Sequence, residues 1–145
     1  MIIPLRIDTH SEGNTPTERE IDVLNAQAKM LFEKDAAKAI QLAKNAFQLS
    51  VAGGYDKGKA DSLFILCECN FAVSNFKSSI QKSDEALKIY KRLFLDKEIA
   101  ECLKASGRAL LRIGEYQKAL AKFSAALPVY EKLNDKSGQI SILNN

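Results

Sequence analysis

Apolar residues recur along this chain at intervals of three and four, a spacing typical of helices that bury one face. In the first such stretch, over residues 17–33, the apolar positions are Ile21, Leu24, Ala28 and Leu31. The same spacing continues to the end of the chain. It predicts further helices over residues 36–51, 57–73, 76–94, 97–113 and 116–133, and the start of a seventh over residues 136–145.

Breaks between these stretches are short and carry turn residues. Gly53 and Gly54 are expected to end the second helix, because glycine adopts the left-handed conformation at little cost. The link at Gly114 is only two or three residues long, which makes its two helices antiparallel. Pro128 lies inside the sixth predicted helix and is expected to kink it. A break there is the less favoured alternative, because Tyr130 continues the apolar phase.

The N-terminal stretch has no helical pattern. Residues 1–16 are predicted to be irregular, since His10 through Pro16 has the composition of turns and loops. Thr17 is followed three residues later by Glu20, a spacing that predicts a helix N-cap with a capping box.

The pattern repeats with a period of 40 residues. Tyr90 and Tyr130 are 40 positions apart, as are Ala86 and Ala126. A period of this length indicates a solenoid, in which each unit must stack on its neighbour to bury its apolar face. The expected units are residues 17–54, 55–94 and 95–134, followed by a partial or capping unit over residues 135–145.

Composition and charge narrow the class of function. The 21 basic and 18 acidic residues give a net charge of +3, too mild a balance for a dedicated nucleic-acid or membrane binder. No apolar run approaches the length of a membrane span. The first residues lack the pattern of a secretory signal, and the three cysteines have no framework spacing. A cytoplasmic location with reduced thiols is therefore expected.

No catalytic, cofactor or metal site is predicted. His10 is the only histidine and precedes the first helix, so no Ser/His/Asp or Cys/His arrangement can be assembled. Cys67 and Cys69 are two positions apart on a helix and point to opposing sides, which prevents joint metal binding. We expect Cys67 to pack as a small core residue, because it takes the position that Gly107 fills one unit later, and we expect the chain not to be an enzyme.

The residues of the third unit resemble a tetratricopeptide repeat. The matching positions are Leu103, Gly107, Tyr116, Ala119, Phe123 and Ala126, and the second unit offers Leu63, Cys67, Phe76, Ser79, Ser83 and Ala86. The resemblance implies an all-α, right-handed superhelix of three helical hairpins plus a C-terminal helix. It also implies a scaffold that binds a protein, a peptide or another domain of its own chain.

Two details refine this resemblance. The 40-residue period is longer than the usual period of about 34 residues, and it is similar to that of arrays attached to bacterial diguanylate cyclases, histidine kinases and transcriptional regulators. This similarity implies the sensory or interaction region of a larger signalling protein. Chaperone-binding arrays grip a C-terminal carboxylate with basic and amide side chains. That function is excluded because the matching positions are Leu24, Ala28, Ile65, Glu101 and Ala105.

By the same resemblance, the first helix of each hairpin lines a concave groove. The candidate groove residues are Leu24, Phe32, Asp61, Phe64, Glu68, Phe71, Lys104, Arg108, Leu111 and Arg112. An aromatic floor of Phe64 and Phe71 beside a basic ridge of Lys104, Arg108 and Arg112 would suit a peptide with acidic and apolar side chains. The alternatives are that the phenylalanines are core residues and that the ridge is a solvated helix face.

A second hypothesis is self-association, for example as a homodimer. After residue 133 the last hairpin is covered only by a short segment with Ile140, Ile142 and Leu143, which predicts a large uncovered apolar surface.

Overall fold

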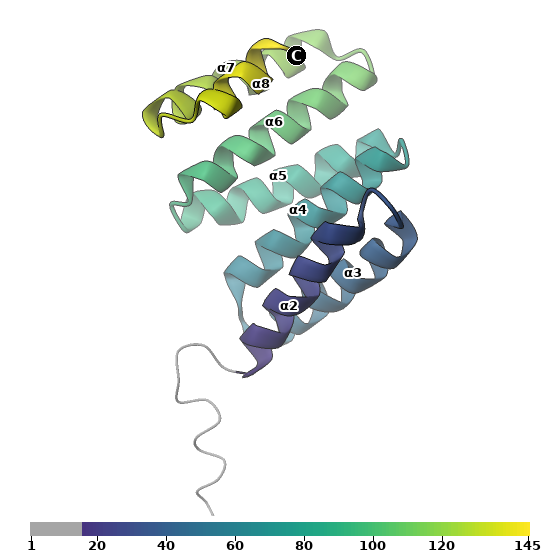
Figure 1. Ribbon diagram of the computed structural model, residues 1–145. Coiled ribbons are helices and arrows are strands. Elements are labelled where there is room, and N and C mark those ends of the chain that lie inside the picture. The colour runs from purple at the N-terminus through teal and green to yellow at the C-terminus, as the bar shows by residue number, and fades with distance from the viewer. Residues whose placement is uncertain (1–15) are drawn as a thin grey trace, which may run out of the picture.

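The computed structural model describes residues 16–145, which form seven α-helices and no β-strand (Figure 1). Consecutive helices pack as hairpins that stack in chain order, with the last helix against the third hairpin. The helices are α2 (Pro16–Leu31), α3 (Ala36–Gly53), α4 (Asp56–Ala72), α5 (Phe76–Arg92), α6 (Asp96–Arg112), α7 (Tyr116–Lys132) and α8 (Lys136–Leu143). The predicted all-α stack of three hairpins plus a C-terminal helix is confirmed.

The observed helix ends agree with the predicted ends to within two residues, but the predicted N-cap is wrong. Helix α2 begins at Pro16, which makes Thr17 its second helical residue. Proline is favoured at a first helical position because its missing N–H would have no partner inside the helix. The expectation of an irregular segment over residues 1–16 therefore fails at Pro16, and its other positions lie outside the described residues.

The turns between helices repeat every 20 residues, half the period of the sequence. A residue with positive φ closes each of five consecutive turns: Gly54 (68°), Ser74 (63°), Phe94 (57°), Gly114 (83°) and Asn134 (56°). The next residue donates its N–H to a carbonyl in the last turn of the preceding helix, as in the 2.9 Å bond from Glu115 to Leu110. Gly54 takes this left-handed conformation at the helix end, as predicted. Phe94 takes it as well, although the conformation is disfavoured for residues that carry a Cβ.

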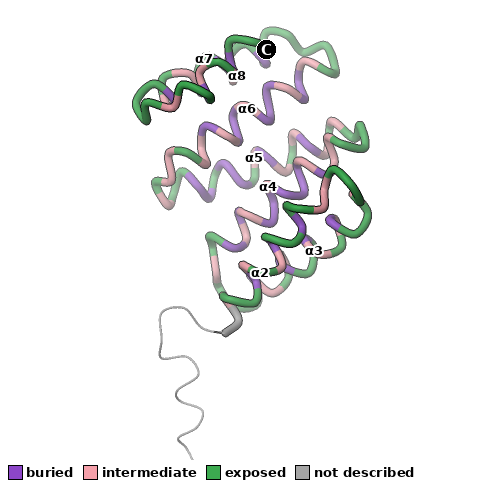
Figure 2. Tube along the Cα trace, in the orientation of Figure 1, coloured by how far each residue is buried: buried purple, intermediate pink, exposed green. Residues whose placement is uncertain are grey.

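Burial is concentrated in the middle of the stack (Figure 2). Helices α4 and α6 each bury eight residues, whereas α7 buries four. The first helices α4 and α6 contact each other across the stack in addition to the helices before and after them. Small residues allow close approach between helices. At Gly107, an added Cβ would lie 2.6 Å from the Phe123 ring. Helix α7 continues through Pro128, so the alternative of a break at this proline is excluded.

The three cysteines, Cys67, Cys69 and Cys102, are free and buried. Burial raises the pKa of the Cys67 thiol to about 12 and that of Cys69 to about 11. A thiol with such a pKa is protonated at neutral pH and behaves as a small core group, which agrees with the packing role predicted for Cys67.

Candidate functional site

A cavity of about 450 Å³ opens between α2, α4 and α6, the first helices of the three hairpins. We call it the groove pocket. Phe32, Phe64 and Ile65 supply its apolar part. Four of the predicted groove residues, Phe32, Asp61, Phe64 and Glu68, line this pocket together. The remaining lining residues are Asp22, Asn25, Ala26, Lys29, Lys57, Tyr90, Lys97, Glu98 and Glu101.

The lining of the groove pocket is acidic. Five carboxylates against three lysines give these side chains a net charge of −2, from Asp22, Asp61, Glu68, Glu98 and Glu101 and from Lys29, Lys57 and Lys97. The predicted basic ridge of α6 is absent from the lining. The pocket itself therefore favours a positively charged group, opposite to the charge of the ligand expected from the sequence.

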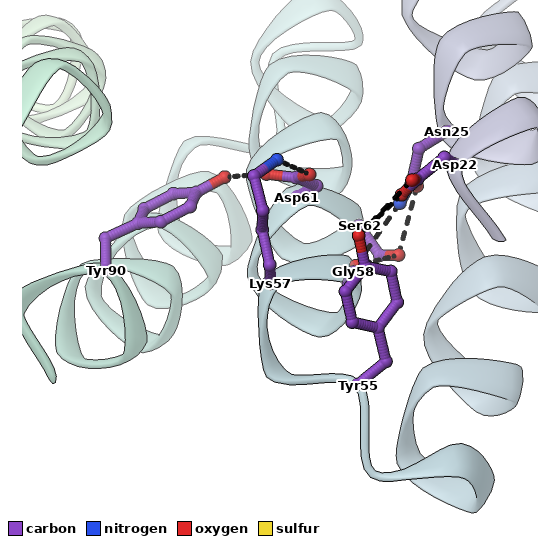
Figure 3. Close-up of polar contacts among 8 residues, drawn as sticks. All are labelled: Asp22, Asn25, Tyr55, Lys57, Gly58, Asp61, Ser62 and Tyr90. Atoms are coloured by element: carbon purple, nitrogen blue, oxygen red, sulfur yellow. Dashed lines mark hydrogen bonds and ion pairs between the residues drawn. The ribbon is translucent and has the colours of Figure 1, made fainter. Parts of the chain in front are cut away.

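Two hydrogen-bonding groups hold the Asp61 carboxylate in place (Figure 3). The Tyr90 hydroxyl donates to Asp61 Oδ1 at 2.5 Å, and Lys57 Nζ donates to Oδ2 at 2.8 Å. Tyr90 is buried, and both its burial and the neighbouring Asp61 charge raise the pKa of its hydroxyl. The carboxylate is therefore fixed at the pocket wall by a donor that stays protonated.

The same arrangement recurs one repeat later at Glu101. The Tyr130 hydroxyl donates to Glu101 Oε2 at 2.7 Å, and Lys104 Nζ lies 3.3 Å from Oε1. Lys104 also lies over the Tyr130 ring, 5.7 Å from the ring centroid. Lys104 is thus paired with a carboxylate of its own helix, and it does not line the pocket.

For Asp22 of the first hairpin, a tyrosine from the turn before α4 takes this role. Tyr55 donates its hydroxyl to the two oxygens of Asp22 at 3.0 and 3.3 Å. Beside it, Asn25 Nδ2 donates to the Gly58 carbonyl at 3.2 Å, and the Ser62 hydroxyl donates to Asn25 Oδ1 at 3.0 Å (Figure 3). These bonds tie α2 to the first turns of α4 and preorganise the pocket.

Glu68 is a half-buried carboxylate for which no ion pair forms within residues 16–145. Burial raises the pKa of Glu68, Arg108 opposes that change, and the Glu101 charge adds to it. The Glu68 carboxylate is therefore costly to keep charged, and a cation in the pocket would reduce that cost.

Phe71 lies apart from this pocket, in a cluster with the two arginines of the predicted ridge. The Arg108 guanidinium carbon is 4.4 Å from the Phe71 ring centroid, and that of Arg112 is 4.7 Å from the Phe76 centroid and 5.5 Å from the Phe71 centroid. The Phe71 and Phe76 rings meet edge to face at 5.3 Å. Phe64 and Phe71 consequently share a face of α4 but lie in different places, Phe64 in the groove pocket and Phe71 beside the arginines.

Two further candidates are not brought to the groove pocket. Leu24 is two positions from Asp22, which places it about 200° away around the helix, on the opposite side of α2. Leu111 lines a separate cavity of about 420 Å³ beside α7 and α8. Helical period alone did not identify the groove-facing side, because both faces of a first helix carry apolar residues.

Sequence reasoning did not include Tyr90 and Tyr130 among the site residues, although their spacing was visible. Each tyrosine follows its carboxylate partner by 29 residues, and both pairs obey the 40-residue period. The recurrence of a carboxylate and a tyrosine at the same spacing was the signal in the sequence that could have pointed to these site residues. Their contact could not be inferred, because it depends on how the two helices of a hairpin pack.

Within the described residues, no group of three or more His, Cys, Asp or Glu side chains is arranged to hold a metal ion. None of the described helices combines the length and the apolar character needed to cross a membrane.

Comparison with known proteins identifies the fold. A scan against protein-family models finds no match, and a search of curated proteins finds none either. Among solved structures, the chain is similar to the TPR domain of Arabidopsis FLU, with a TM-score of 0.74 and 19% sequence identity. The alignment covers 81% of this chain and 99% of that chain. The chain has a tetratricopeptide-like fold. At this level of sequence identity, the similarity shows the fold alone.

Proposed function

We propose that this chain is a non-catalytic scaffold that binds a peptide segment, from another protein or from another domain of its own chain, in the groove pocket. The observation that carries the proposal is the pocket between α2, α4 and α6, which joins an apolar floor to carboxylates fixed by tyrosine hydroxyls. Its volume of about 450 Å³ lies within the range of binding pockets.

The ligand inferred from this chemistry carries a lysine or arginine next to apolar side chains. Phe32 and Phe64 offer surface to an apolar side chain or to the aliphatic stem of a basic one. Glu68 and Glu98 line the pocket without an ion pair inside residues 16–145, so both are available to a cation. A basic group there offsets the cost of the partly buried carboxylates.

A randomised peptide library, displayed so that both peptide ends continue into the carrier protein, tests this proposal. We expect selection on the 145-residue chain to enrich peptides with lysine or arginine beside apolar residues. The Glu68→Gln/Glu98→Gln variant should bind the selected peptides at least about ten-fold more weakly, since it loses charge-assisted hydrogen bonds. Phe64→Ala should weaken the same peptides.

The matched control is Glu20→Gln/Glu131→Gln, which removes two exposed carboxylates outside the pocket. This variant should bind the selected peptides as tightly as the original chain. Failure to enrich any peptide, or equal binding by Glu68→Gln/Glu98→Gln, would overturn the proposal.

A second candidate function is self-association through an apolar surface at the C-terminal end. Tyr116, Leu120 and Leu143 border the second cavity and are 68%, 61% and 72% exposed. Large exposed apolar patches mark interaction surfaces. Light scattering over a wide concentration range tests this function: a dimer that Leu120→Glu converts to monomer supports it, and a monomer throughout contradicts it.

The cellular context is part of the proposal. The 40-residue repeat supports a role as the interaction region of a larger bacterial signalling protein, and three unpaired cysteines are typical of a cytoplasmic protein. An antibody against this domain should detect, in extracts of the source organism, a cytoplasmic protein much larger than 16.0 kDa. A secreted protein, or a cytoplasmic one of that size, would contradict this context.

A further inference from the structure

Arg108 and Arg112 are one helical turn apart on α6 and rest on aromatic rings of the neighbouring hairpin. Their guanidinium carbons lie 4.4 Å from the Phe71 centroid and 4.7 Å from the Phe76 centroid, respectively. At these distances, cation–π attraction holds both side chains in place. A guanidinium carries five N–H donors along its edges, and contact with a ring leaves edge donors available.

No acidic side chain uses those edges. Within residues 16–145, the ion pairs of α6 involve Asp96 and Glu101 but neither of the two arginines. Glu68 is the acidic group that interacts electrostatically with Arg108, yet it is not close enough to form an ion pair. Two neighbouring guanidiniums therefore retain positive charge and unused donors.

This arginine pair lies beyond the groove pocket, on the same helices α4 and α6. Phe64, Glu68 and Phe71 follow one another at spacings of four and three along α4, so they share one helix face. Phe64 and Glu68 line the pocket, and Phe71 continues that face to the arginines. A ligand that lies along α4 and α6 would pass from the carboxylates of the pocket to the guanidiniums.

We infer that the groove is two-signed: its pocket takes a basic side chain, and Arg108 with Arg112 takes the carboxylate of an aspartate or glutamate in the same peptide. This inference rests on the proposed peptide-binding function. A guanidinium edge matches a carboxylate with two parallel N–H···O bonds, which makes arginine suited to this recognition.

A side-chain carboxylate fits better than a peptide C-terminus. Arg112 is the last residue of α6 and is exposed, so a peptide chain in contact with it can continue into solvent. Glu98 and Arg108 are ten positions apart, about 15 Å along the helix. An extended peptide covers that length in about four or five residues, which sets the expected spacing between its basic and acidic residues.

The display library described above tests the inference, because its peptides have no free C-terminus. We expect selected peptides to contain aspartate or glutamate about four or five residues from the basic residue. For such a peptide, Arg108→Gln/Arg112→Gln should weaken binding at least about ten-fold. When the acidic residue of the peptide is changed to glutamine, the peptide should bind the original chain and this variant equally. Arg108→Lys/Arg112→Lys should recover only part of the affinity, since lysine lacks the planar fork.

The control variant is Lys44→Gln/Lys88→Gln, which removes two exposed positive charges on α3 and α5, outside the pocket lining, and should bind like the original chain. Circular dichroism and thermal melting show whether each variant remains folded. Two outcomes would overturn the two-signed groove and leave the proposed function standing. One is enrichment of basic and apolar residues without an acidic one. The other is a loss of binding in the arginine variant that does not depend on the peptide's acidic residue. A library that enriches nothing would overturn both.

Discussion

The hydroxyl of Tyr90, near the end of α5, donates a 2.5 Å hydrogen bond to the carboxylate of Asp61 on α4. One repeat later, Tyr130 on α7 donates a 2.7 Å bond to Glu101 on α6. Both tyrosine rings are buried, and both carboxylates line the groove pocket. The bond therefore joins the core of each hairpin to the wall of the pocket, so that helix packing and carboxylate position depend on each other.

Removal of the Tyr90 hydroxyl should destabilise the fold. Tyr90→Phe keeps the ring but leaves the Asp61 carboxylate without one donor, and we expect the free energy of unfolding to fall by about 1–3 kcal/mol. Urea denaturation followed by circular dichroism measures this change. Tyr116→Phe is the matched control, because Tyr116 is 68% exposed, and it should have almost no effect. Equal effects of the two substitutions would contradict a stabilising role for the Tyr90–Asp61 bond.

The raised pKa of the buried tyrosines predicts a loss of stability in alkali. Above pH 10, the ordinary tyrosine pKa, the unfolded chain releases the Tyr90 proton while the folded chain keeps it. The folded state then binds more protons, so the free energy of unfolding falls as pH rises, by about 1.4 kcal/mol per pH unit for each such tyrosine. Below pH 10, this contribution to stability is fully present.

Urea denaturation at several pH values above 10 checks this dependence. Because Tyr90→Phe removes one titrating group, its stability should decline less steeply than that of the original chain, by about 1.4 kcal/mol per pH unit. Tyr90→Phe/Tyr130→Phe should decline less steeply still. Parallel curves for the three proteins would show that these hydroxyls do not keep their protons in the fold.

Two adjacent alanines of α7 test the helix packing. Ala126 is fully buried, and we expect Ala126→Leu to destabilise the fold by about 1–3 kcal/mol, because the close-packed interface has no room for three more carbon atoms. Ala125 is exposed, and Ala125→Leu should stay within about 0.5 kcal/mol of the original. Thermal melting of both variants measures this difference in stability. The reverse order would mean that the buried face of α7 is assigned incorrectly.

Phe94 is a site where substitution should stabilise the chain. Its φ of 57° is disfavoured for residues with a Cβ, and its side chain is 85% exposed, so little packing is lost on its removal. The equivalent turn positions 54 and 114 already hold glycine. Phe94→Gly should raise the free energy of unfolding by about 0.5–1 kcal/mol. Phe94→Ala keeps the Cβ and should bring no comparable gain, so an equal gain from both would contradict a conformational origin.

The sequence by itself determined the helices, their turns and their order in the stack. Helical spacing of apolar residues is a local property, and it located both ends of each helix to within two residues. Its one clear failure, the N-cap assigned to Thr17, occurred where Pro16 could start the helix equally well. The 40-residue period then required the hairpins to stack, since no single hairpin can bury its apolar face.

Only the tertiary structure decided which side chains meet at the groove. Leu24 and Leu111 have the helical phase of groove residues but lie away from the pocket. Tyr90 on α5 donates to Asp61 at the pocket wall, whereas Arg108 lies over the Phe71 ring of the neighbouring hairpin and outside the pocket lining. Such pairings join residues from different helices or hairpins. They depend on how those helices cross and where each side chain points, which the spacing of residues along one helix does not specify.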